Sequence, residues 1–261
     1  MTKIYYFSGT GNSRAAAEQL GVILGASLHN IAACARRREW YIEAETAVFI
    51  VPAYAYSIPL IVRRFIEHVK IKAEFCAALI TYGTTPGGAR AEFASLFRKK
   101  GVSQFFITGI PAVENFIPIF GSPSSAHIEK RLEMQERAVD RAAAAIIARR
   151  TRSAFPLRPL SALISALFRG GKAGFARLFR VEARCNGCGV CARLCPAGII
   201  SIENDRPVFG EGCEQCQACL NWCPANAIQY LRLTAGARRY THPGVTLADM
   251  LKSLDNSHAG R

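Results

Sequence analysis

Eight of the ten cysteines lie between residues 185 and 223, in two runs that share the spacing C-x2-C-x2-C-x3-C-P. The first run contains Cys185, Cys188, Cys191 and Cys195, and the second contains Cys213, Cys216, Cys219 and Cys223. Thiolate sulfur is a soft ligand that suits iron–sulfur clusters. Closely spaced cysteines can surround one corner of a [4Fe–4S] cube, while a more distant cysteine supplies the last ligand.

The two cysteine runs belong to a longer repeat, because residues 185–202 and 213–230 align without gaps. In two-cluster ferredoxins the fourth cysteine of each run binds the other cluster. The spacing therefore predicts two ligand sets, namely Cys185, Cys188, Cys191 and Cys223 for one cluster, and Cys213, Cys216, Cys219 and Cys195 for the other. Structural zinc is the alternative, but zinc sites usually combine two distant cysteine pairs, which these runs match poorly.

Clustered cysteines in a secreted chain would instead indicate disulfides. The first residues, MTKIYYFSGTGNSR, lack the basic start, long apolar run and cleavage site of a signal peptide. The apolar stretches are also too short to cross a bilayer. We therefore expect a cytoplasmic protein without a membrane span.

A second motif is the segment YFSGTGNSR, residues 6–14, between an expected strand and an expected helix. Backbone N–H groups at a helix N-terminus form an anion site, and small polar residues add donors. The candidate phosphate ligands are Ser8, Gly9, Thr10, Gly11, Asn12 and Ser13. The dinucleotide fingerprint is incomplete because Arg14 stands in place of its third glycine. The loop has no lysine, which argues against a nucleoside triphosphatase.

The loop resembles the phosphate loop of flavodoxins, which bind FMN. Two later segments, PAYAYSIP (52–59) and TYGTTPGGA (81–89), resemble the flavodoxin loops that enclose the flavin ring. The resemblance implies ring contacts from Pro52, Tyr54, Tyr56, Tyr82, Gly83, Gly87 and Gly88. Taken one by one, these tyrosines could also be ordinary loop aromatics.

Strands and helices alternate over the first 150 residues, which predicts an α/β fold with a parallel sheet covered on both faces. The expected strands are 4–7, 28–31, 47–51, 75–82 and 104–110. The expected helices are 12–24, one from about 59, 89–97 and 124–150. The segment from Ala32 to Glu45 has no clear helical pattern and stays unassigned.

The whole chain resembles the flavodoxin–ferredoxin fusion proteins of anaerobic microbes. This implies a flavodoxin-like doubly wound sheet over 1–150, a basic connector over 151–180, a small α+β two-[4Fe–4S] ferredoxin domain over 181–230 and a tail over 231–261. The segments VENFIP (113–118) and RRYTHP (238–243) also resemble parts of that family. Phe116 stands where the family often has tyrosine.

The chain carries a net charge of +14, while residues 181–230 hold more acidic than basic side chains. The connector is basic and contains Leu160, Leu163, Ile164, Leu167 and Phe168, which we expect to cover one of the two domains. A membrane-surface helix is the alternative for this segment. The basic surface could steer an acidic redox protein such as a ferredoxin, or it could be ordinary solvated surface.

These features predict an electron-transfer protein that holds FMN and two [4Fe–4S] clusters. A flavin-dependent reductase of a small substrate is the second hypothesis. A nucleic-acid-binding protein with structural clusters is a third, and the flavin loops argue against it. The sequence contains neither a Ser-His-Asp set nor histidines at metal-ligand spacing, so no catalytic residue is assigned. It does not determine the electron donor, the acceptor or the oligomeric state.

Overall fold

The computed structural model describes residues 1–151, 163–167 and 172–255. Its N-terminal part is a parallel sheet with strand order β2-β1-β3-β4-β5. The strands are β1 (Thr2–Tyr6), β2 (Ser27–Asn30), β3 (Tyr41–Pro52), β4 (Lys70–Tyr82) and β5 (Phe105–Pro111). This order defines the flavodoxin-like doubly wound fold, as predicted, and its topological switch point lies between β1 and β3.

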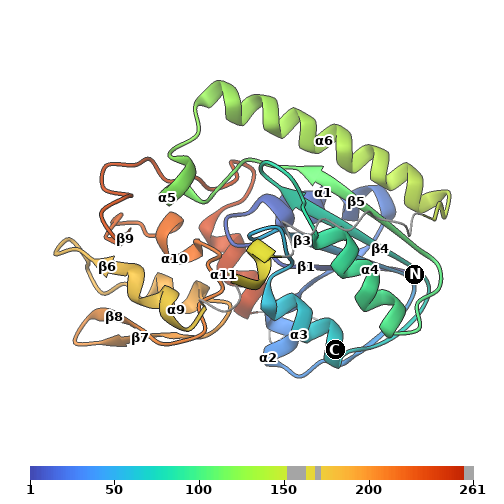
Figure 1. Ribbon diagram of the computed structural model, residues 1–261, viewed down its shortest axis with the longest axis horizontal. Coiled ribbons are helices and arrows are strands. Elements are labelled where there is room, and N and C mark those ends of the chain that lie inside the picture. Colours follow the sequence, from blue (N-terminus) through green and yellow to red (C-terminus); the bar gives the residue numbers. More distant parts are fainter. Residues whose placement is uncertain (152–162, 168–171, 256–261) are drawn as a thin grey trace.

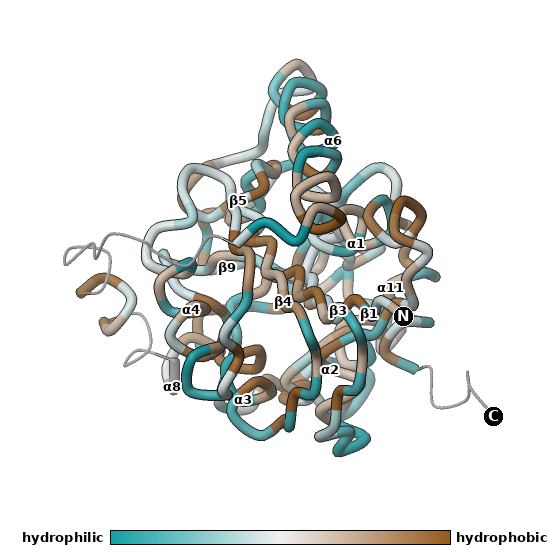
Figure 2. The backbone as a smooth tube through the Cα atoms, turned by 90° about the vertical axis from the view of Figure 1, so that its right-hand side faces the viewer, coloured by the Kyte–Doolittle hydropathy of each residue, from teal (hydrophilic) through white to brown (hydrophobic). Residues whose placement is uncertain are grey.

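Helices cover both faces of this sheet (Figure 1). On one face lie α1 (Asn12–Leu24) and α6 (Ser125–Ile147), and on the other lie α2 (Ile31–Arg36), α3 (Leu60–His68) and α4 (Ala89–Lys99). Along β3, Phe49 packs toward the α3 and α4 side, while its neighbour Ile50 packs toward α1 and α6. Because both faces are covered, the central strands are almost continuously apolar. Figure 2 shows them as brown, hydrophobic stretches inside the molecule.

The unassigned segment from Ala32 to Glu45 forms α2 and the start of β3. The Asn30 side chain caps α2, because its Oδ1 accepts a hydrogen bond from the Ala32 amide at 2.9 Å. The strands β3 and β4 begin earlier than predicted, as a two-stranded extension in which Glu43 pairs with Lys72. The Lys72 ammonium lies 2.6 Å from the Glu43 carboxylate. Exposed charges between apolar residues hid this extension in the sequence.

The C-terminal part contains two small antiparallel sheets, and it lies at one end of the parallel sheet (Figure 1). One pairs β6 (Phe179–Val181) with β9 (Ile228–Tyr230), and the other pairs β7 (Ile200–Glu203) with β8 (Arg206–Phe209). The short helices α9 (Val190–Leu194) and α10 (Ala218–Asn221) each carry the third cysteine of one run. The remaining elements are α5 (Ile117–Phe120), α8 (Lys172–Phe175), η1 (Ala176–Leu178) and α11 (Leu247–Asp255). This small α+β unit agrees with the predicted class.

One hydrophobic core joins the two parts of the molecule. The core on the α3 and α4 side of the sheet also includes Cys216, Ala218 and Trp222, together with Val245 and Met250 from the tail. The described part of the tail, up to Asp255, therefore packs on this core. The predicted boundaries at residues 150, 180 and 230 stay predictions.

Within the basic connector, Leu160 and Phe168 lie outside the described residues. Ser165 is buried, and its hydroxyl donates to the Ala55 carbonyl at 2.8 Å. Ile164 is half-buried and contributes to a cavity wall, as expected of a residue that covers a domain. Leu163 and Leu167 are 57% and 69% exposed, so the expectation is wrong for these two residues. Leu163 and Leu167 are two positions before and after Ser165, so in this helical turn they lie on the side opposite to Ser165. In the described part of the chain, no helix combines the length and apolarity needed to cross a membrane.

The buried side chains of β3 give a test of the fold. Ile50→Ala should lower the free energy of unfolding by about 2–5 kcal/mol, because the Ile50 side chain is fully buried and its loss leaves a cavity. Ile147→Ala is the matched control, since Ile147 is 66% exposed, and it should change stability by less than about 0.5 kcal/mol. Urea unfolding followed by circular dichroism measures both. Equal losses in the two variants would contradict this placement of the core.

Candidate functional site

A cavity of about 360 Å³ lies at the carboxyl edge of the parallel sheet. Its walls come from the loops that follow β1, β3, β4 and β5, which meet at this edge. The volume falls within the usual range for small-ligand sites. The residues of these loops and of the adjoining strand and helix ends that line it include Ser8, Gly9, Thr10, Asn12, Ser13, Pro52, Tyr54, Tyr56, Thr81, Tyr82, Gly83, Glu114, Asn115 and Phe116.

The loop after β1 leads into the N-terminus of α1. Gly11 precedes the helix with a φ of 103°, a conformation that favours glycine. Its amide donates to the Ser8 hydroxyl at 3.1 Å. The Ser13 hydroxyl lies 2.7 Å from that of Thr81, which ties the first helical turn to the end of β4. The loop thus presents a helix N-terminus and several hydroxyls to the cavity.

Most of the residues predicted to bind a flavin line this cavity, but three glycines among them do not. Gly11 lies against the tail, because a Cβ added there would be 2.8 Å from the His242 Cβ. Gly87 has a φ of 51° and packs under the side chain of Tyr56. Gly88 precedes the first residue of α4. These three glycines shape turns beside the cavity, and their contact with a ligand stays a prediction.

A strained turn presents two of the tyrosines. Ala55 and Tyr56 have φ values of 46° and 66°, which are costly for residues with side chains. The turn is closed by two hydrogen bonds between the backbones of Tyr54 and Ser57, at 2.8 and 3.0 Å. The Tyr54 hydroxyl is buried and has no hydrogen-bond partner among the described residues. Burial raises its pKa, with smaller contributions from the charges of Cys216, Glu214 and Glu114.

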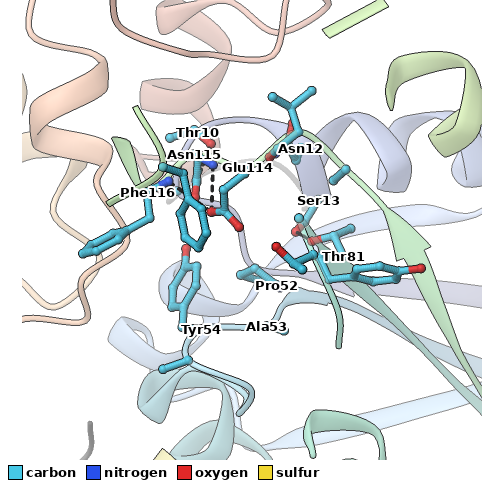
Figure 3. Close-up of a pocket in the computed structure, with 18 of the residues that line it drawn as sticks. Thr10, Asn12, Ser13, Pro52, Ala53, Tyr54, Thr81, Glu114, Asn115 and Phe116 are labelled. Atoms are coloured by element: carbon cyan, nitrogen blue, oxygen red, sulfur yellow. Dashed lines mark hydrogen bonds between the residues drawn. The ribbon is translucent and has the colours of Figure 1, made fainter. Parts of the chain in front are cut away.

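The loop after β5 supplies cavity residues that the sequence analysis did not assign as ligands, although it singled out the segment VENFIP. The Asn115 side chain donates to the Thr10 hydroxyl at 2.7 Å. The Glu114 carboxylate accepts the amides of Asn115 and Phe116 at 3.0 and 3.1 Å. Figure 3 shows Thr10, Glu114, Asn115 and Tyr54 around the same opening. The polar pair Glu114-Asn115 within that segment is the signal that sequence reasoning could have used.

The structure brings the cysteines of both runs together around two small cavities. One is lined by Cys185, Cys188, Cys191 and Cys223. The other is lined by Cys195, Cys213, Cys216 and Cys219. The fourth cysteine of each run thus faces the first three of the other run. Cys188 is exposed, whereas Cys216 and Cys219 are buried, so the first cavity is the outer one and the second is the inner one.

The surroundings of these sulfurs suit iron–sulfur ligands. The Ala227 amide points to the Cys223 sulfur at 3.3 Å, and the Gln215 amide points to the Cys213 sulfur at 3.4 Å. Such N–H groups stabilise negative charge on cluster sulfur. Burial raises the pKa of the Cys216 and Cys219 thiols, so an ionised form at these positions needs compensating metal charge.

No three His, Cys, Asp or Glu side chains in the described ranges are arranged around a single metal ion. The four sulfurs of a [4Fe–4S] site bind four different iron atoms, so they need not approach a common ion. The two cysteines outside the runs, Cys34 and Cys76, are buried in the core around the parallel sheet. Burial raises the pKa of each to about 12, which makes them unreactive.

The sheet cavity and the inner cysteine cavity share a wall. Gln215 lines the sheet cavity, and its backbone amide donates a hydrogen bond to the sulfur of Cys213. Cys213 in turn lines the inner cysteine cavity. The backbones touch at the next residue, since a Cβ added at Gly9 would lie 2.2 Å from the Cys216 carbonyl oxygen. Only a glycine fits at that point. The segment from Cys213 to Cys216 is therefore the partition between the two sites.

A comparison with known protein families agrees with the predicted iron–sulfur site in the C-terminal part of the chain. Residues 179–201 match the model of the 4Fe-4S binding domain family, which covers the first cysteine run. A comparison with curated protein sequences gives no match. The chain therefore combines a flavodoxin-like domain, defined by its strand order, with a 4Fe-4S binding domain.

Solved structures of flavin proteins resemble part of the chain. A flavodoxin from Fusobacterium nucleatum bound to flavin mononucleotide is 10% identical, with coverage of 56% of this chain and 96% of that one and a TM-score of 0.40. An FMN-dependent NADH-azoreductase from Bacillus anthracis in complex with FMN is 9% identical, with coverage of 56% and 99% and a TM-score of 0.36. At these scores the likeness adds nothing to the fold assignment.

Proposed function

We propose that this chain is an electron-transfer protein that holds FMN in the sheet cavity and a [4Fe–4S] cluster in each cysteine cavity. The observation that carries the proposal is the shared wall, because Gln215 contacts both sites. Electron transfer falls off steeply with distance, so two redox groups separated by one layer of backbone exchange electrons readily. The reducing cytoplasm is the proposed compartment.

The residues of the sheet cavity fit FMN in two respects. The N-terminus of α1 and the hydroxyls of Ser8 and Thr10 suit a phosphate monoester. The Tyr54 side chain lines the same cavity and is a candidate contact for the flavin ring. When bound, FMN accepts two electrons and passes them singly to one-electron carriers such as the clusters.

The crossed cysteine sets are the proposed ligands of the two clusters. The outer cluster takes Cys185, Cys188, Cys191 and Cys223, and the inner cluster takes Cys213, Cys216, Cys219 and Cys195. The exposure of Cys188 places the outer cluster close to solvent. The inner cluster adjoins the flavin cavity through the segment around Gln215.

The crossed arrangement predicts which cluster each cysteine supports. Cys195→Ser should damage the cluster that shares the inner cavity with Cys213, whereas Cys191→Ser should damage the outer cluster. The two variants are matched, since both remove one sulfur from the first run. Iron and sulfide analysis with paramagnetic resonance of each reduced variant distinguishes them. An intact inner cluster in the Cys195→Ser protein would disprove the crossed scheme.

The phosphate assignment predicts a preference for FMN over riboflavin. Thr10→Ala removes a hydroxyl that lines the cavity and accepts from Asn115, so it should weaken FMN binding by about tenfold. Riboflavin lacks the phosphate, so its affinity should change little. Fluorescence titration of both flavins measures the difference. Equal affinity of the unchanged protein for the two flavins would show that this loop does not hold the phosphate.

An acidic redox protein is the proposed partner. Arg177 and Arg180 are exposed, and they flank Phe179, which lines the inner cysteine cavity. Basic side chains beside a redox site raise the association rate of an acidic protein. A ferredoxin-like carrier with an acidic surface has this chemistry.

This docking site predicts a salt-dependent rate. Reduction by an acidic ferredoxin should slow as ionic strength rises past 0.1 M, where the Debye length is about 10 Å. The double variant Arg177→Glu and Arg180→Glu should lose most of this salt dependence. Arg137→Glu is the control, because Arg137 is also exposed and lies on α6, which lines neither cysteine cavity. Stopped-flow rates that respond equally in both variants would refute the docking site.

A further inference from the structure

Residues near the C-terminus bind three successive parts of the phosphate loop. The indole N–H of Trp222 donates to the Gly9 carbonyl at 3.0 Å. The His242 amide donates to the Thr10 carbonyl at 2.8 Å. The Tyr240 hydroxyl donates to the Asn12 side chain at 2.7 Å. The loop that begins the sheet domain is thus held by residues that come more than two hundred positions later.

The bonds from Trp222 and His242 fix the direction of two loop amides, while the bond from Tyr240 holds the Asn12 side chain at the start of α1. In a trans peptide the C=O and the following N–H point in opposite directions. Because the Gly9 carbonyl points toward the Trp222 indole, the Thr10 amide points away from that indole. When the Thr10 carbonyl is held by His242, the Gly11 amide points toward the Ser8 hydroxyl, which it meets at 3.1 Å. An anion site made of backbone amides requires such fixed peptide orientations.

The packing around these contacts is close and apolar. Tyr240 is 2% exposed and Trp222 is 8% exposed. Burial lowers the pKa of His242 to about 4, so its imidazole is neutral near pH 7. His242 therefore packs against Gly11 and supplies a backbone donor, without adding a positive charge for an anion.

We propose that Trp222 and Tyr240 are positioning residues for the phosphate of FMN, so that the C-terminal part of the chain completes the flavin site. This rests on the proposed function, because it takes the loop from Ser8 to Ser13 as the phosphate site. Trp222 lies next to Cys223 in sequence. The phosphate site is thus linked to the segment that carries a cluster ligand, and the sheet domain alone lacks these donors.

The test uses the full-length protein loaded with its clusters. Trp222→Phe removes the indole donor, and Tyr240→Phe removes only a hydroxyl. Trp40→Phe is the matched control, since Trp40 packs on Phe65 and His68 away from the cavity. Dissociation constants for FMN and riboflavin are measured by fluorescence, with iron and sulfide content on the same samples. FMN binding should weaken about tenfold in each of the first two variants. Riboflavin binding, iron content and the control should be unchanged.

The outcomes separate this inference from the proposed function. If the unchanged protein binds FMN and riboflavin equally, the phosphate assignment itself fails. If it prefers FMN and both variants keep that preference, the loop is positioned without these donors and the inference is wrong. An equal loss of both flavins would also overturn it, because that result indicates a general loss of structure. If Trp222→Phe loses iron, its flavin affinities no longer report on the indole hydrogen bond alone. The ratio of FMN to riboflavin affinity in Tyr240→Phe then supports or contradicts the inference.

Discussion

The contact between Gly9 and the carbonyl of Cys216 is the constraint on which the rest of the structure depends. A Cβ at Gly9 would lie 2.2 Å from that oxygen, so the two backbones can meet only at a glycine. Trp222 reinforces the contact with a hydrogen bond to the same residue. Because the loop after β1 also lines the sheet cavity, this contact brings the cavity next to the inner set of cysteines.

The parallel sheet makes this contact possible by placing four loops at one edge. Both faces of β3 and β4 are buried over residues 46–51 and 75–81, so the strands are fixed in register and the loops that follow them have defined starting points. The Arg131 side chain joins two of these strand ends, since it donates to the carbonyls of Tyr82 and Ala112 at 2.9 Å each. The strained turn at Ala55 and Tyr56 is tolerated because its surroundings determine its conformation.

The fold and the grouping of the cysteines could be predicted from sequence because each depends on a local pattern. Apolar runs between helical segments gave the order of elements, and the repeated spacing gave two sets of four sulfurs. The early starts of β3 and β4 could not be predicted, because the pair of Glu43 with Lys72 links distant residues. The roles of Trp222 and Tyr240 were also hidden, since a buried aromatic shows its hydrogen-bond partner only after folding.

In the proposed function, FMN bound in the sheet cavity and the inner cluster exchange electrons within one molecule. The most direct measurement injects about one electron per molecule by flash photoreduction into protein that carries FMN and both clusters. Absorbance changes of clusters and flavin are then followed at several protein concentrations. Electrons should redistribute between the cluster and flavin signals at a rate that does not depend on protein concentration. A rate proportional to concentration, or a flavin that stays oxidised while the clusters are reduced, would contradict the proposed exchange.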